Sequence, residues 1–232
     1  MGLFLAMSGV AGATKEAVER SLRHFASNAK QDPQSELATE DILKGSIIVE
    51  APGNKVTVLY PDGFMEWDAA SAHISSEFRL PVFSFHIHDG DFWMYILHVD
   101  GEEVGHFNPI PEYWDDRISQ AERQKWSGDA SVICSHWPEM AAENIKNYLV
   151  HWDLEKLSLN PTQKAYPDDK FPLGLDWQLC DFMKKLGLIY PIDQNGNPIG
   201  SRSRLSDSTS SMERPQDGNT MEKIKKPWWK LW

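Results

Sequence analysis

Cysteine is scarce in this chain, with only Cys134 and Cys180 among 232 residues. A secreted disulfide scaffold normally uses more cysteines than this, so we expect two free thiols. No apolar run reaches the roughly 18 residues that a membrane-spanning helix needs. The sequence therefore predicts a soluble, cytoplasmic protein without a membrane span.

Catalytic and nucleotide-binding signatures are also missing. The chain has no GxSxG elbow, P-loop, GxGxxG fingerprint or HExxH pair, so nothing indicates a known hydrolase, nucleotide-binding or zinc-enzyme site. Cys134 and His136 stand two positions apart, and residues at that spacing on a helix do not face each other. We predict no catalytic residue, no cofactor and no metal, and an enzyme is the less favoured class.

Positive charge is in short supply. The chain has 23 Lys and Arg against 34 Asp and Glu, a net charge of −11. From residue 201 onward seven Lys and Arg outnumber four acids, so this tail is +3 and the remaining body is −14. Nucleic acid is bound mainly by Lys and Arg, so we expect no nucleic-acid partner. A basic protein partner suits the body better, and the plain alternative is that acidity only serves solubility.

The first half of the chain alternates between strand and helix patterns and predicts a β-α-β-β-α unit. Two Asp-Gly pairs then favour type I′ turns, which predicts a three-stranded antiparallel meander over 82–107. The expected elements of the unit are a strand at 3–10, a helix at 14–28, a hairpin at 46–50 and 55–60, and a helix at 66–78.

The pattern of the second half predicts helices as far as Asn195, where the amino-acid composition changes. Four helices are expected, at 119–127, from Asp129 to before Pro138, at 139–152 and at 177–186. From Asn195 to Thr220 the chain has few large apolar residues, which predicts a flexible polar linker. The class is thus α+β, with a sheet unit at 1–112, a helical region packed on it at 113–194, the linker at 195–220 and a Trp/Lys-rich peptide at 221–232.

Histidines and aromatic residues gather in the meander. Two-residue loops would pair His88 with Asp91, His86 with Trp93 and Tyr95 with His106. That register places His86, Trp93, Tyr95 and His106 on one face of the sheet, away from the core. We interpret this face as a polar and aromatic surface covered by helices or by a partner; a metal site is the weaker reading, because Trp93 and Tyr95 separate His106 from the other histidines.

The terminal peptide carries three tryptophans within five residues: Trp228, Trp229 and Trp232. Exposed indoles are unfavourable in water, so we expect these tryptophans, with three lysines nearby, to bind a surface. Three candidate surfaces remain open: a groove on the same chain, a groove on another protein or another copy, and an anionic membrane surface.

Three segments resemble a group of uncharacterised bacterial proteins: MGLFLAMSGV at 1–10, NPIPEYW at 108–114 and KPWWKLW at 226–232. The resemblance implies a bacterial, cytoplasmic protein and carries no activity. We therefore expect a non-enzymatic binding protein, for example an immunity-type inhibitor of a basic partner. The alternative is an enzyme that uses the His86, Trp93, Tyr95 and His106 face.

Overall fold

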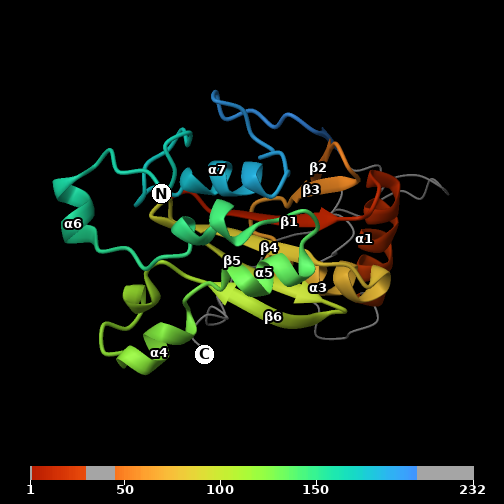
Figure 1. The fold of residues 1–232 in the computed structure, drawn as a ribbon. Coiled ribbons are helices and arrows are strands. Elements are labelled where there is room, and N and C mark those ends of the chain that lie inside the picture. Colours follow the sequence, from red (N-terminus) through yellow and green to blue (C-terminus); the bar gives the residue numbers. More distant parts are fainter. Residues whose placement is uncertain (1, 30–44, 203–232) are drawn as a thin grey trace, which may run out of the picture.

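The fold is α+β, as predicted, and is built on one antiparallel sheet (Figure 1). A computed structural model describes residues 2–29 and 45–202. Within them the sheet has seven strands in the order β6-β5-β4-β1-β3-β2-β7, so the first strand of the chain is central. The strands are β1 (Leu5–Ala11), β2 (Ile47–Ala51), β3 (Lys55–Leu59), β4 (Val82–His88), β5 (Phe92–Val99), β6 (Glu102–Phe107) and β7 (Ser201–Arg202).

Helices cover both faces of the sheet. The α-helices are α1 (Lys15–Ala29), α3 (Trp67–Phe78), α4 (Gln120–Lys125), α5 (Ala130–His136), α6 (Leu154–Leu159) and α7 (Gln178–Lys185), and the 3-10 turns are η1 (Pro111–Tyr113), η2 (Ala142–Asn144) and η3 (Lys146–Tyr148). α6 stands out from the other elements at the left of Figure 1. In the part of the chain described, no helix is both long and apolar enough to span a bilayer.

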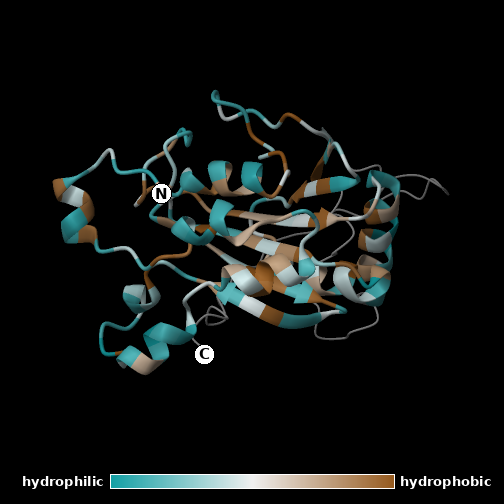
Figure 2. Cartoon of the chain, in the orientation of Figure 1, coloured by the Kyte–Doolittle hydropathy of each residue, from teal (hydrophilic) through white to brown (hydrophobic). Residues whose placement is uncertain are grey.

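Apolar residues of α1 and α3 pack on one face of the sheet. Leu22 of α1 and Ile74 of α3 are fully buried and share a cluster with Val58 and Val82 of the strands. The inner strands are largely apolar in Figure 2, whereas α4 is mostly hydrophilic, in keeping with its lack of buried residues. α4 instead owes its start to a capping box between Ser119 and Glu122.

The opposite face is closed by α7. Phe182 of this helix is fully buried, and its ring lies 5.0 Å from Trp93 and 6.0 Å from Tyr95, between ring centroids. Trp137, at the end of α5, joins the same cluster by donating its indole N–H to the carbonyl of Leu186 at 3.0 Å. This core has more buried residues than the core beneath α1 and α3, and several aromatic rings pack together in it.

The helix predicted over 139–152 is wrong. The segment forms the two short turns η2 and η3 instead. Its backbone amides bind elsewhere: the Trp152 N–H donates to the carbonyl of Pro109 at 2.8 Å, and the Asn147 N–H donates to the hydroxyl of Tyr166 at 3.2 Å. The apolar stripe that suggested a helix is buried all the same, because tertiary hydrogen bonds replace the helical ladder.

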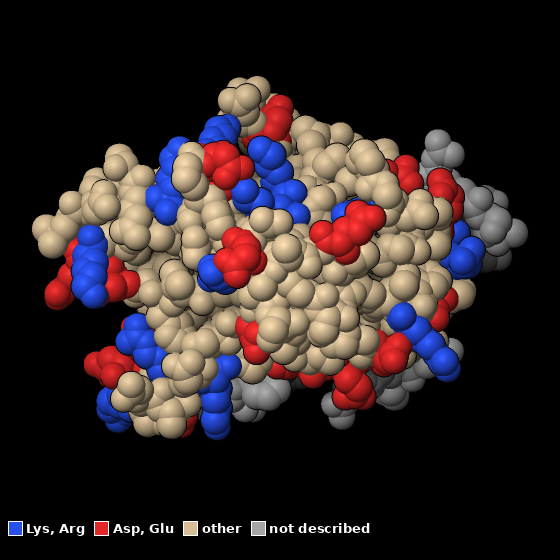
Figure 3. Space-filling view, in the orientation of Figure 1, with Lys and Arg blue, Asp and Glu red and all other residues tan. Residues whose placement is uncertain are grey.

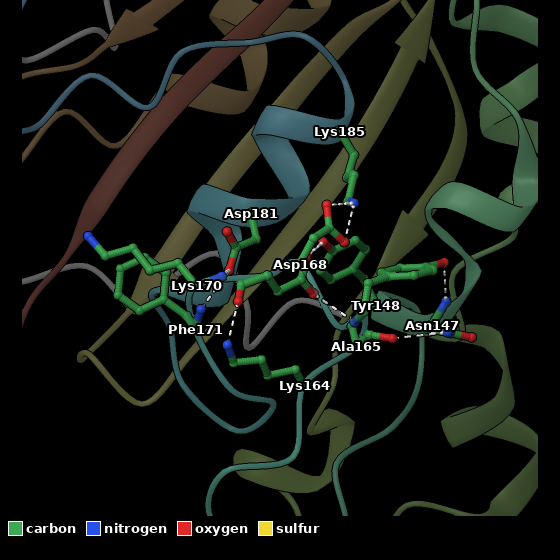
Figure 4. A network of polar contacts seen from close by, with 11 residues as sticks. Asn147, Tyr148, Lys164, Ala165, Asp168, Lys170, Phe171, Asp181 and Lys185 are labelled. Carbon is green, nitrogen blue, oxygen red and sulfur yellow. Dashed lines mark hydrogen bonds and ion pairs between the residues drawn. The ribbon is translucent and has the colours of Figure 1, made fainter.

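Buried carboxylates fasten the loop between α6 and α7 (Figure 4). Asp181 of α7 accepts the backbone N–H groups of Lys170 and Phe171 at 2.9 and 2.7 Å. Asp169 accepts the hydroxyl of Tyr148 and, at 2.9 Å, the N–H of Tyr166. The loop is therefore held to the helix by hydrogen bonds to charged groups, which are stronger than neutral ones.

Candidate functional site

The β4–β5 hairpin places its side chains differently from the prediction. The turn itself is as expected, with Asp89 and Gly90 at φ of 54° and 74° and the Asp91 N–H bonded to the His88 carbonyl. The ladder beyond the turn, however, pairs His88 with Phe92. Asp91 is thus an extra residue on one strand, and such a bulge shifts every later pair by one position.

Trp93 and Tyr95 therefore lie on the core face, opposite His86. They pair with Ile87 and Phe85 rather than with His86 and Ser84. The Trp93 indole is fully buried and donates to the Gln178 side chain at 3.1 Å. Burial also raises the pKa of the Tyr95 hydroxyl. Both residues belong to the core beneath α7, so the prediction that Trp93 and Tyr95 share a face with His86 was wrong.

His106 is separated from the other histidines as well. A second irregularity, between Leu97 and His98, shifts its pairing to Ile96 at the edge of the sheet. Its ring nitrogens contact the Glu103 carboxylate and the Lys125 carbonyl. The hydrogen bond to Glu103 raises the pKa of His106. Because Ile96 also pairs with Ser84, His106 lies on the same face of the sheet as His86, as predicted, but two strands away. Its contacts hold the end of α4 against β6.

His86 and His88 form a buried pair at the hairpin end of the sheet. Nε2 of His86 and Nδ1 of His88 are 3.4 Å apart, and both residues are less than a tenth exposed. Burial lowers the pKa of His86 to about 3 and also lowers the pKa of His88. Two neutral imidazoles therefore lie side by side at neutral pH.

An aromatic surface covers this pair. Phe4 and Tyr113 each pack edge-on against His88, at 5.0 and 5.5 Å between ring centroids. These two rings nevertheless remain 43% and 38% exposed, and Leu3 beside them is 39% exposed. Large apolar side chains left in solvent next to one another make this a candidate interaction surface.

Carboxylates accompany the exposed rings. Asp91 accepts the Tyr113 hydroxyl at 2.6 Å, and Asp89 lies against Gly2. Both carboxylates are exposed. The hydrogen bond to Asp91 raises the pKa of Tyr113 to about 12. The residues Leu3, Phe4, Asp89, Asp91 and Tyr113 are called the hairpin face below, a surface that combines apolar rings with negative charge.

A hollow of about 460 Å³ lies along the outer side of α7. We call this cavity the α7 hollow. The residues that line it are Lys170, Phe171, Trp177, Cys180, Asp181, Lys184, Tyr190, Ile192, Asp193 and Gln194. The sequence prediction missed it. A signal was present, because Trp177, Cys180 and Lys184 recur at helical spacing, but the walls beyond the helix come from two loops that only the fold brings together.

Metal and thiol chemistry find little support in the described residues. Residues 2–29 and 45–202 hold no group of three or more His, Cys, Asp or Glu placed to bind a metal ion. Cys134 and Cys180 are free thiols, and burial raises the pKa of each, to about 12 for Cys180. A thiol with a raised pKa is a poor nucleophile at neutral pH.

The predicted binding residues Trp228, Trp229 and Trp232 lie outside the described residues, as do most of the predicted linker and the whole terminal peptide. Comparison with family models, with curated proteins and with solved structures gives no match for this chain. The functional argument therefore depends on the chain's own surfaces.

Proposed function

We propose that this chain is a non-enzymatic binding protein whose hairpin face receives a cationic, tryptophan-bearing protein segment. The observation that carries the proposal is the exposure of Phe4 and Tyr113 beside two carboxylates, although both rings pack on the buried His88. Exposed aromatic faces attract indole rings and ammonium groups. Asp89 and Asp91 add charge complementarity for lysine.

The occupant to which we commit is the chain's own peptide at 221–232. It offers three indoles and, among its cations, Lys225, Lys226 and Lys230, close together in sequence. Each indole has about 150–250 Å² to bury, which is worth several kcal/mol for three at roughly 25 cal/mol per Å² before ordering costs. A foreign basic protein, such as a toxin met by an immunity-type inhibitor, would compete with the peptide for the same face.

The sheet register supports the reach that this docking requires. Arg202 pairs with Ile47, which is in line with Leu59, Met7 and Phe85 across the sheet. Four strand spacings are about 19 Å, and the three residues from Phe85 to His88 add about 10 Å along the strand. The hairpin face is therefore about 22 Å from Arg202. The 18 residues from 203 to 220 would span about 23 Å on average if unstructured.

A titration with the synthetic peptide 221–232 tests the proposal. The receptor is a chain that ends at Thr220, checked by its melting curve, and binding is followed by calorimetry. We expect saturable binding that weakens about tenfold in Asp89→Asn/Asp91→Asn, because two complementary charges are removed. Phe4→Ala should also weaken binding, because it removes an exposed ring.

A matched pair of carboxylates elsewhere provides the control. Glu143 and Glu155 are exposed, on η2 and α6, so Glu143→Gln/Glu155→Gln changes the net charge equally without touching the hairpin face. We expect this variant to bind the peptide like the unaltered receptor. Equal weakening in both double variants would show a general charge effect, and absence of peptide binding would refute the proposal.

A further inference from the structure

We propose that the α7 hollow binds a planar aromatic molecule that carries an anionic group. This inference is independent of the hairpin face. About 460 Å³ lies in the range of small-molecule sites. Its lining joins one side of α7 to the loops on either side of that helix, so the hollow is a product of the tertiary fold.

Aromatic rings form the walls. The ring centroids of Phe171 and Trp177 are 5.8 Å apart, and those of Trp177 and Tyr190 are 5.9 Å apart. Cys180 follows Trp177 by one helical turn and adds its thiol to the same wall, with Ile192 facing from the next loop. Three rings in a row favour a flat, aromatic occupant, because offset and edge contacts between rings are attractive.

Two of the residues that line the hollow are lysines that form no ion pair among the described residues. Lys170 lies over the Phe171 ring, 4.9 Å from its centroid, and Lys184 follows Cys180 by one helical turn. Among residues 2–29 and 45–202 neither lysine forms an ion pair within 4.0 Å. The neighbouring Lys185, by contrast, pairs with Asp168 at 2.8 Å. Figure 3 shows Lys and Arg side chains gathered over α7, although the chain as a whole is acidic.

The acids that line the hollow are engaged by the backbone. Asp181 accepts the N–H groups of Lys170 and Phe171. Asp193 accepts those of Asn195 and Asn197 at 2.8 and 2.9 Å. These bonds hold the Asp181 carboxylate to the loop before α7 and the Asp193 carboxylate to its own loop, so neither carboxylate forms an ion pair with the two lysines.

Tyr190, one of the lining residues, offers its hydroxyl as a candidate for a further polar contact. It is buried, and no hydrogen-bond partner for it is found in the part of the chain that the structure describes. A buried polar group without a partner is costly. A ligand whose ring lies along the aromatic wall can offer this hydroxyl an acceptor, which gives orientation as well as affinity.

Calorimetry on the full chain with matched pairs of small molecules tests the inference. Indole-3-acetate and the neutral indole-3-acetamide have nearly the same shape; adenosine 5′-monophosphate and adenosine form the second pair, so carboxylate and phosphate ligands are distinguished. We expect at least one anion to bind with a dissociation constant below about 1 mM, and its neutral counterpart to bind about tenfold more weakly. No binding of either anion at 1 mM, or equal binding within both pairs, would overturn the inference.

Charge substitutions locate the site. Lys170→Gln/Lys184→Gln should weaken binding of the anion at least about fivefold and leave binding of the neutral compound unchanged. Lys170 and Lys184 are exposed, so folding should be retained. Lys156→Gln, which removes a surface lysine paired with Asp153 on α6, is the control and should have no effect. An equal loss in the control and in the double variant would place the ligand elsewhere.

Discussion

The imidazole of His86 lies flat on the indole of Trp67, with ring centroids 5.0 Å apart and planes 5° from parallel. Trp67 begins α3 and His86 belongs to β4, so the stack joins a helix to the sheet beneath the hairpin face. Burial, together with the neighbouring His88, lowers the pKa of His86 to about 3. The stack therefore contains a neutral imidazole over most of the pH range in which the protein is folded.

This stack predicts a loss of stability in mild acid. Below about pH 6.5 the unfolded chain protonates His86, whereas the folded chain does not until about pH 3. The free energy of unfolding should thus fall as the pH drops through this window, by about 1.4 kcal/mol per pH unit for this residue. Urea unfolding at several pH values should show a shallower slope in His86→Phe.

His136 provides the control, because it is an exposed histidine on α5. His136→Asn should keep the slope of the unaltered protein between pH 6.5 and 5. His88 has a lowered pKa as well, so His86→Phe should remove only part of the slope. An unchanged slope in His86→Phe would contradict the neutral stack.

Two neighbouring aspartates in Figure 4 should differ in their effect on stability. Asp181→Ala leaves the Lys170 and Phe171 amides without their acceptor, and we expect a loss of about 2 kcal/mol in the free energy of unfolding. Asp168→Ala removes only an ion pair of an exposed carboxylate with Lys185, which solvent screens, so the loss should be much smaller than in Asp181→Ala. Equal losses in urea unfolding would refute the role assigned to Asp181.

The prediction from the sequence succeeded where turn and cap residues mark element ends. The Asp-Gly turns, the turn of the hairpin between 50 and 55 and the start of the helix at Asp129 depend on local chemistry, and the structure has turns or a cap at these places. The prediction of which side chains share a face in the meander failed for a different reason. One inserted residue, Asp91, reverses the faces of β5 relative to β4, and an alternating pattern does not show which residue is unpaired.

Of the four residues predicted to share a face, only His86 lies beneath the hairpin face. Leu3, Phe4 and Tyr113 were not predicted, because they are far from β4 in the sequence and meet it only through tertiary packing. The α7 hollow was not predicted for the same reason, because its walls come from segments that only the fold brings together. The domain boundaries, the linker at 195–220 and the docking of the terminal tryptophans stay predictions.

Zinc should not bind at His86 and His88. The two rings face each other, but Asp91 is bonded to Tyr113 and His106 to Glu103, so a third ligand is not at hand. Elemental analysis of protein purified without a metal-affinity tag should find much less than one equivalent of zinc. Nearly one equivalent, lost in His86→Ala, would contradict this expectation.

Deletion of residues 227–232 should show whether the peptide docks on its own chain. Docking on the same chain predicts an unchanged mass in solution and a lower melting temperature, because buried indole area is lost. Docking on a neighbouring copy predicts a lower mass, because an exchanged arm holds a dimer together. Light scattering and thermal unfolding measure both quantities. If neither changes, self-docking is wrong and the peptide is free for a foreign partner.

The most direct test of the hairpin face is photo-crosslinking in the intact chain. Tyr113 is replaced by p-benzoylphenylalanine, and Leu159, which is 86% exposed on α6, is replaced in a matched control. Peptide mass spectrometry then identifies the residues to which the probe has become covalently attached. The account predicts attachment at position 113 to residues 221–232 and little attachment of this peptide at position 159. Equal attachment at the two positions, or attachment of the peptide only at position 159, would contradict it.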